Sequence, residues 1–400
     1  MIPPAAVAAI SAAILAYEVL LVRLFAIVQW HHFAFMAISV ALLGFGVSGA
    51  LLALARTWAA RHASSLFVLG AALFAVTAPG AFLLAQLVPF NALEVVWAPG
   101  ELFELGLIYL LLLVPFTAGA TCIGLAFLVS AASPGRVYLW NLLGSGAGAL
   151  AAIGALALLP PMACLAASGA IALAAALLCA LANRLAEALV TLALLGLAGP
   201  LFWLTAPAPW ITLHVSPLKG LPRALAVEDA RLLGTYSSPL AMLSVVESPT
   251  APFRVAPGLS LTAPALPPPQ VGIFADGEFA TAIDLWDGRA DSLTYLAHTA
   301  DALAYQLVDR PEVLVLGAGG GRLVLQALFH DAARIDAVER NGQMLRLLSR
   351  DLAERTGGLY ARATIRAVRA DPRHFVTVTG RKWDLIHLPL IGSGRGGAVR

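Results

Sequence analysis

The stretch that decides the fold is Glu312–Leu323, which reads Glu-Val-Leu-Val-Leu-Gly-Ala-Gly-Gly-Gly-Arg-Leu. Its apolar Val-Leu-Val-Leu run is typical of a short buried strand. Gly317, Gly319 and Gly321 follow with G-x-G-x-G spacing, and a helical pattern continues to Phe329. The stretch therefore predicts a strand, a tight glycine turn and a helix in that order.

A second strand, 334–338, follows this helix, and Glu339 stands at its end. Strand, glycine loop, helix, strand and acid is the order of a nucleoside-binding βαβ unit, in which glycines let the backbone and a helix N-terminus approach a ligand. A dinucleotide fingerprint requires a further glycine at position 322, where this chain has Arg322. The loop therefore favours S-adenosylmethionine or its decarboxylated form over NAD.

The first half of the chain has a membrane composition. The whole sequence is 60% hydrophobic and 12% charged, with a mean hydropathy of +0.84. Residues 1–205 contain five Arg, five Glu, no Lys and no Asp. A wholly soluble protein is excluded by this composition. Because basic residues do not gather among aromatic ones, nucleic acid is not an expected partner.

Seven apolar stretches are long enough to cross a bilayer, which takes about 20 residues. We expect these spans at roughly 6–28, 33–54, 64–88, 105–130, 138–159, 163–182 and 186–205. The three cysteines lie inside such stretches without metal-ligand spacing, so we expect apolar packing and no metal site.

The domain organisation follows from these patterns. We predict a transmembrane helical domain at 1–205, a linker with a small β-rich subdomain at 206–310, and a partial nucleotide-binding domain at 311–400. Strands are expected within 236–247 and 271–279, and a helix at 293–307. From residue 312 on, four strands are expected, the last two at 363–368 and 383–388.

Three regions of the chain resemble the membrane-fused spermidine synthase-like proteins of bacteria. They are the first-helix segment Tyr17–Arg23, the segment Gly135–Ser145, and the series Asp276-Gly277-Glu278, glycine loop, Glu339 and Asp371. The resemblance implies a multi-span helical membrane bundle followed by an α/β doubly wound, methyltransferase-like Rossmann domain with a small β-rich N-terminal subdomain.

The resemblance also implies roles for single residues. Glu339 is placed to accept hydrogen bonds from both ribose hydroxyls, and Asp371 to hold the adenine amino group. Asp276 corresponds to the substrate-side wall, although a simple β-turn explains it nearly as well. Tyr295 and His298, one helical turn apart, are weaker candidates for the substrate side, and helix packing is the alternative.

Position 389 departs from the family pattern. Aminopropyltransferases place a catalytic Asp just after the fourth strand, where it deprotonates the attacking amine. This chain has Pro389 there, and His387 is the nearest alternative base. The catalytic residue is therefore unknown, and a methyltransferase-like use of the cofactor pocket is easier to reconcile with the sequence than polyamine synthesis.

These observations favour a bacterial inner-membrane, multi-pass transferase that alkylates a small amine or other nucleophile. A membrane carrier, or a structural membrane protein with a degenerate or regulatory nucleoside-binding domain, is the alternative. Only four of the seven strands usual in a methyltransferase sheet are found, so we expect a C-terminally truncated chain, or one that works as a homo-oligomer or with a completing chain.

The side of the membrane is predicted differently by two arguments. A cofactor made in the cytoplasm requires a cytoplasmic nucleotide domain. Four arginines at positions 56, 61, 136 and 184 fall in alternate loops, which the positive-inside rule assigns to the cytoplasm together with the N-terminus. Seven spans would then put the second half of the chain outside. We give the cofactor argument more weight, because only four residues support the other.

Overall fold

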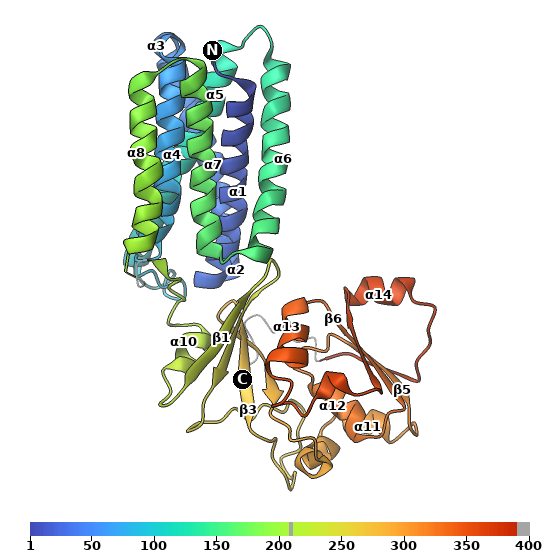
Figure 1. The fold of residues 1–400 in the computed structure, drawn as a ribbon. Helices are drawn as coiled ribbons and strands as arrows, with labels where there is room; N and C mark the ends of the chain where they lie inside the picture. The colour runs from blue at the N-terminus through green and yellow to red at the C-terminus, as the bar shows by residue number, and fades with distance from the viewer. Residues whose placement is uncertain (208–210, 390–400) are drawn as a thin grey trace. The chain divides into compact units, whose positions relative to one another are not determined.

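The computed structural model describes residues 1–207 and 211–389, without the side chains of His31, His32, Ala34, Glu187 and Leu204. The chain divides into two compact units, one of residues Met1–His214 and one that begins at Val215. Figure 1 shows that the first is a bundle of helices and that the second combines strands with short helices.

The first unit is built from long apolar helices and one short helix. They are α1 (Pro4–Val28), α2 (His31–Leu54), α3 (Arg56–Arg61), α4 (Ala63–Ala85), α5 (Pro99–Val129), α6 (Pro134–Leu158), α7 (Pro161–Ala182) and α8 (Ala186–Thr205). Among the described residues, six helices are long and apolar enough to cross a membrane. The seventh predicted span is the helix α8, whose described apolar stretch, Ala188–Trp203, is shorter. This is the architecture of a multi-pass membrane protein.

The helix α1 lies at the centre of the bundle and contacts α2, α4, α5, α6 and α7. Its Tyr17 ring is fully buried and packs against Phe74 of α4 and Phe116 of α5, with ring centroids 5.6 and 5.2 Å apart. These two ring contacts join α1 to α4 and α5 inside the bundle.

The contact between α1 and α6 depends on glycine. A Cβ on Gly144 would lie 2.1 Å from the carbonyl oxygen of Ala8, and one on Gly148 would lie 2.2 Å from that of Ala12. These pairs show that the two helices run parallel. Small residues four apart allow such backbone contact in a membrane bundle. The Ser11 hydroxyl, which also bonds within α1, donates to Asn141 Oδ1 of α6 at 2.8 Å.

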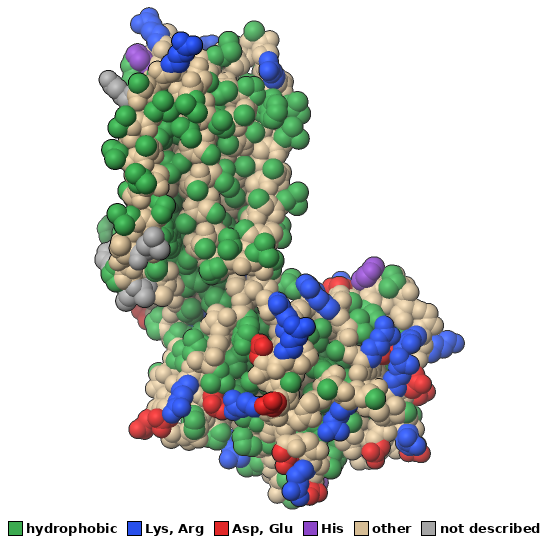
Figure 2. Space-filling view, in the orientation of Figure 1, with side chains coloured by type: hydrophobic (Ala, Val, Ile, Leu, Met, Phe, Trp, Pro, Cys, Tyr) green, Lys and Arg blue, Asp and Glu red, His purple; other side chains and the backbone are tan. Residues whose placement is uncertain are grey.

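The two ends of the bundle differ in charge. At one end the N-terminal ammonium group donates to Asn183 Oδ1 at 2.7 Å, which brings the start of α1 to the end of α7. Arg56 and Arg61 begin and end the short helix α3, and Arg184 follows α7; Figure 2 shows basic side chains gathered at this end. The opposite end includes Gln86, whose side chain bonds to backbone atoms of residues 212 and 214 at 3.2 Å. The chain therefore leaves the bundle opposite the arginines.

The second unit contains an antiparallel sheet and a parallel sheet. The antiparallel strands, in the order β1-β2-β3-β4, are β1 (Arg231–Ser237), β2 (Met242–Glu247), β3 (Gln270–Ala275) and β4 (Glu278–Asp284). The parallel strands, in the order β7-β6-β5-β8, are β5 (Glu312–Leu316), β6 (Arg334–Glu339), β7 (Ile365–Arg369) and β8 (Leu385–His387).

Short helices connect and cover these sheets. They are α10 (Gly220–Leu225), the 3₁₀ helix η1 (Ala290–His298), α11 (Ala302–Tyr305), α12 (Arg322–Phe329), α13 (Gly342–Arg346), the π-helical turn η2 (Leu347–Asp351), the 3₁₀ turn η3 (Leu359–Ala361) and α14 (Pro372–Val378). Met344, Leu347 and Leu348 pack against apolar residues of β2, β3 and β4. Since α13 also contacts β6 and β7, this segment joins the two sheets into one unit.

One expectation from the sequence is confirmed here and another is corrected. Strands are found within 271–279, where β3 and β4 are joined by a turn at Asp276 and Gly277, whose φ angles are +53° and +81°. The expected helix at 293–307 is divided into η1 and α11 at Thr299, whose hydroxyl donates to the Leu296 carbonyl and to Gln326 Oε1. The break at Thr299 uses polar contacts, one of them to the distant Gln326, that apolar periodicity does not report.

Candidate functional site

The carboxyl ends of the four parallel strands meet at one edge of the sheet. The glycine loop follows β5, Glu339 ends β6, Asp371 follows β7 and Pro389 follows β8. The strand order runs outward from β5 to β7 on one side and returns to β8 on the other. In open α/β sheets this reversal leaves a crevice at the carboxyl edge, where ligands bind.

The glycine loop turns sharply, and hydrogen bonds within the second unit fix its backbone. Gly317, Gly319 and Gly321 have φ values of +84°, +49° and +85°, a region that disfavours side chains. Gly320 serves packing instead, because a Cβ there would lie 2.3 Å from the Ala282 carbonyl oxygen of β4. The N–H groups of the three positive-φ glycines are all bonded inside the unit.

Glu339 fixes this loop. Its Oε2 accepts the Gly319 N–H at 2.9 Å, and its Oε1 accepts the Asn341 N–H at 2.7 Å. Each carboxylate oxygen can accept a further hydrogen bond. Near it, the buried Tyr360 hydroxyl has no hydrogen-bond partner in the described part of the chain. Burial and the charge of Glu339 raise the pKa of Tyr360, so it stays a neutral donor.

Asp371 lies at the same edge but caps a helix. Its Oδ1 accepts the N–H groups of Arg373 at 3.0 Å and His374 at 3.2 Å, while Pro372 takes the first position of α14. This is a regular N-cap arrangement. The carboxylate is exposed and its second oxygen lacks a hydrogen bond to any described residue, so helix capping does not exclude ligand contact.

The end of β8 places Pro389 against the glycine loop, since a Cβ on Gly317 would lie 3.4 Å from Pro389 Cγ. A proline ring cannot take a proton from a nucleophile. His387 is engaged elsewhere: its Nε2 lies 3.3 Å from Asp301 Oδ1, and its Nδ1 lies 3.2 Å from the Tyr305 hydroxyl. Both ring nitrogens therefore have partners in the fold.

Asp301 and Arg322 complete a polar cluster that sequence reasoning missed. Arg322 Nη2 lies 2.9 Å from Asp301 Oδ2. The hydrogen bond from His387, with help from Arg322, lowers the pKa of Asp301, so this carboxylate is ionised. One signal was present in the sequence: an arginine beginning a helix faces the positive end of the helix dipole, where a cation is unfavourable without a carboxylate.

A buried carboxyl group lies next to this cluster. Asp284 accepts hydrogen bonds from Gln270 Nε2 at 2.7 Å and from the Tyr295 hydroxyl. Burial raises the pKa of Asp284. Tyr295 is itself fully buried, whereas His298 is exposed. These two predicted substrate-side residues therefore do not face one cleft.

Asp276 belongs to the turn between β3 and β4. Its Oδ1 accepts the Met242 N–H at 2.8 Å, and its carbonyl oxygen accepts a hydrogen bond from Lys219 Nζ at 2.6 Å. Lys219 is almost fully buried at 1% exposure. These contacts attach the turn to β2 and to the segment before α10, which is the role the β-turn interpretation assigns to Asp276.

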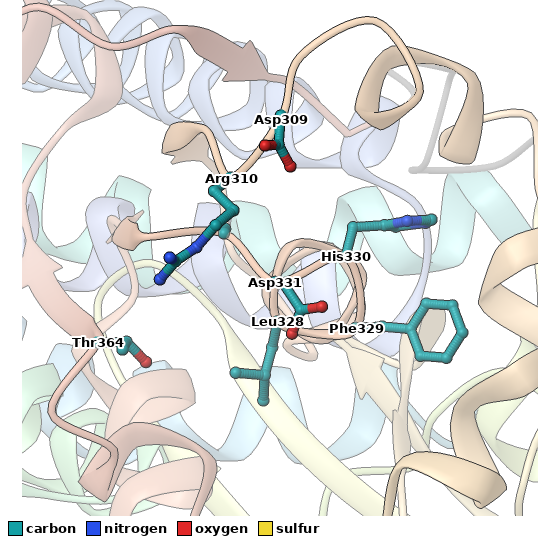
Figure 3. Close-up of a pocket in the computed structure, with 8 residues that line it drawn as sticks. Asp309, Arg310, Leu328, Phe329, His330, Asp331 and Thr364 are labelled. Carbon is teal, nitrogen blue, oxygen red and sulfur yellow. The ribbon is translucent and has the colours of Figure 1, made fainter.

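A cavity of about 700 Å³ lies at the other edge of the parallel sheet (Figure 3). Its lining includes Arg310 before β5, Asp331 before β6 and Thr364 before β7. It is thus separated from the glycine loop by the length of the strands. We place the candidate site at the carboxyl edge, because the glycine loop and the acids that follow the strands meet there.

The residues at the carboxyl edge fit a nucleoside without phosphates. A pyrophosphate would find the amides of Gly317, Gly319 and Gly321 occupied and the Glu339 carboxylate beside them. Ribose hydroxyls would instead find a carboxylate acceptor at Glu339. No protein-family model matches the chain, and no curated protein matches its sequence. Function therefore follows from these residues and their geometry.

Proposed function

We propose that the second unit binds an adenosyl sulfonium compound, S-adenosylmethionine or its decarboxylated form, and that the protein is a membrane-bound alkyltransferase similar to the spermidine synthase-like family. The observation that carries the proposal is the glycine loop with Arg322 in place of the third dinucleotide glycine and with Glu339 bonded to it. The strand order β7-β6-β5-β8 is common to methyltransferase-like and dinucleotide-binding Rossmann sheets. It brings the glycine loop and Glu339 together at the point where ligands bind in such sheets.

The residues would share the work of binding. Glu339 would accept hydrogen bonds from the ribose hydroxyls with its remaining lone pairs, and Asp371 would reach the adenine amino group with its second oxygen. The positive-φ glycines let the nucleoside lie against the backbone. Glu339 already fixes the loop in the absence of ligand. Binding therefore costs little conformational entropy for ordering the loop.

A bound sulfonium would supply the alkyl group: its sulfur–carbon bond breaks with the electron pair left on sulfur, while a lone pair of the nucleophile forms the new bond to carbon. The protein orients the two reactants and excludes water. Pro389 offers no base, and both ring nitrogens of His387 are engaged, one by the Tyr305 hydroxyl and one by Asp301. We therefore favour a nucleophile that attacks without losing a proton first, and whose proton leaves to solvent afterwards.

Calorimetric titration of the purified protein in detergent tests the proposal. S-adenosylmethionine, its decarboxylated form and NAD are compared on the wild type and on Glu339→Ala. We expect an adenosyl sulfonium to bind, and Glu339→Ala to weaken it at least tenfold, about 1.4 kcal/mol. Glu312→Ala is the matched control, because this exposed carboxylate lies at the other end of β5. Preferential NAD binding, or unchanged affinity in Glu339→Ala, would contradict the proposal.

We also propose that the second unit is cytoplasmic, since its cofactor is made there. The arginine-bearing end of the bundle would then lie outside, against the positive-inside rule. Reporters fused after Arg223 decide between the arguments. A cytoplasmic reporter active at this position supports the proposal, and a reporter active only outside the cytoplasm overturns it.

A further inference from the structure

Arg322 has an unused donor beside the glycine loop. It is the first residue of α12 and directly follows Gly321, and its side chain is only 16% exposed. One terminal nitrogen, Nη2, is paired with Asp301 Oδ2 at 2.9 Å. The other, Nη1, is buried and makes no hydrogen bond to any described residue. Buried N–H groups of a charged side chain are normally paired.

The carboxylates around Arg322 do not pair with both of its terminal nitrogens. Asp301 is ionised, but it is shared between Arg322 and His387. Asp284 also lies near Arg322, yet burial raises its pKa and its two oxygens are held by Gln270 and Tyr295. Arg322 therefore faces one shared carboxylate, and its second nitrogen has no anionic partner.

We infer that Arg322 binds the carboxylate of the amino-acid end of the cofactor, so that the site selects S-adenosylmethionine over its decarboxylated form. The inference rests on the proposed function and names the ligand class of the same site. A guanidinium is suited to carboxylates because its donors lie in one plane at matching spacing. Glu339 at one end of the loop meets the ribose, and Arg322 at the other end meets the charged tail.

The test compares four ligands by calorimetry on the full-length protein in detergent. S-adenosylmethionine and S-adenosylhomocysteine carry the carboxylate, whereas decarboxylated S-adenosylmethionine and methylthioadenosine lack it. We expect the wild type to bind the first pair at least tenfold more tightly. Equal affinity for both pairs would overturn the inference while the proposed function survives. If none of the four binds, or if NAD binds more tightly, the proposed function itself fails.

Two variants separate carboxylate recognition from a structural ion pair. Arg322→Met should reduce affinity for the carboxylate-bearing pair at least tenfold and change affinity for the other pair by less than threefold. Asp301→Asn removes the same ion pair but keeps the guanidinium, and it should retain the preference. Equal loss for all four ligands in both variants would assign Arg322 a purely structural role. If Arg322→Met fails to fold, the wild-type comparison and Asp301→Asn still decide.

Discussion

Replacing Gly148 by alanine tests the close contact of α1 and α6. The added methyl group would lie 2.2 Å from the Ala12 carbonyl oxygen, where ordinary contact begins at 3.4 Å. The helices must therefore separate by roughly 1 Å, since such an overlap is strongly repulsive. The 2.8 Å hydrogen bond from Ser11 to Asn141 would then be stretched beyond hydrogen-bonding distance.

The cost follows from these two effects. Overpacking costs about 1–3 kcal/mol, and an interhelical hydrogen bond in a membrane bundle contributes about 0.6 kcal/mol. We therefore expect Gly148→Ala to lower the free energy of unfolding by about 2–4 kcal/mol. Unfolding with sodium dodecyl sulfate in mixed micelles, followed by circular dichroism, measures this difference.

Gly146→Ala is the matched control, because a Cβ at this position of the same helix meets no atom within 4 Å. Alanine is the better helix former by about 1 kcal/mol in water, so Gly146→Ala should be neutral or stabilising. The reasoning would be refuted if Gly148→Ala unfolded at the same detergent fraction as Gly146→Ala.

Two further predictions concern the second unit. Tyr295→Phe removes one donor from the buried Asp284 and should lower the free energy of unfolding by about 1–3 kcal/mol. Denaturant titration measures this difference, and Tyr138→Phe is the control because Tyr138 is exposed. Equal unfolding midpoints for the two variants would contradict the expectation. Asp301 has a lowered pKa in the fold, so its stabilisation is complete above its ordinary pKa of 3.8 and is lost as pH falls through the lower value. The stability difference between wild type and Asp301→Asn should therefore shrink below that pH, and a constant difference from neutral to acid pH would count against it.

The features of the fold that the sequence predicts are those coded by adjacent residues. The apolar strand before Gly317 and the positive-φ glycines are local, and both are found where the pattern places them. The four parallel strands are also found. By contrast, the division of the 293–307 segment depends on Gln326, a distant residue that accepts the Thr299 hydroxyl.

The candidate site was predictable to a smaller extent. Glu339 was expected to face a ribose, but no local sequence pattern predicts that its side chain also accepts the Gly319 N–H. The cluster of Asp301, Arg322 and His387 joins three separate segments of the chain. Sequence periodicity cannot detect such a cluster, because each of its residues is isolated in its own segment and only the folded sheet brings them together.

The parallel pairing of α1 with α6 has a consequence for the synthesis of the protein. Ser11 and Asn141 are 130 residues apart. At about 5–20 residues per second, the ribosome takes roughly 7–26 s to make the intervening chain. During this time α1 lacks its glycine-lined partner α6, although the three long helices made in between, α2, α4 and α5, are already available to contact it. The contact between α1 and α6 can form only after α6 has been made, so translation sets the earliest time at which this step of bundle assembly can occur.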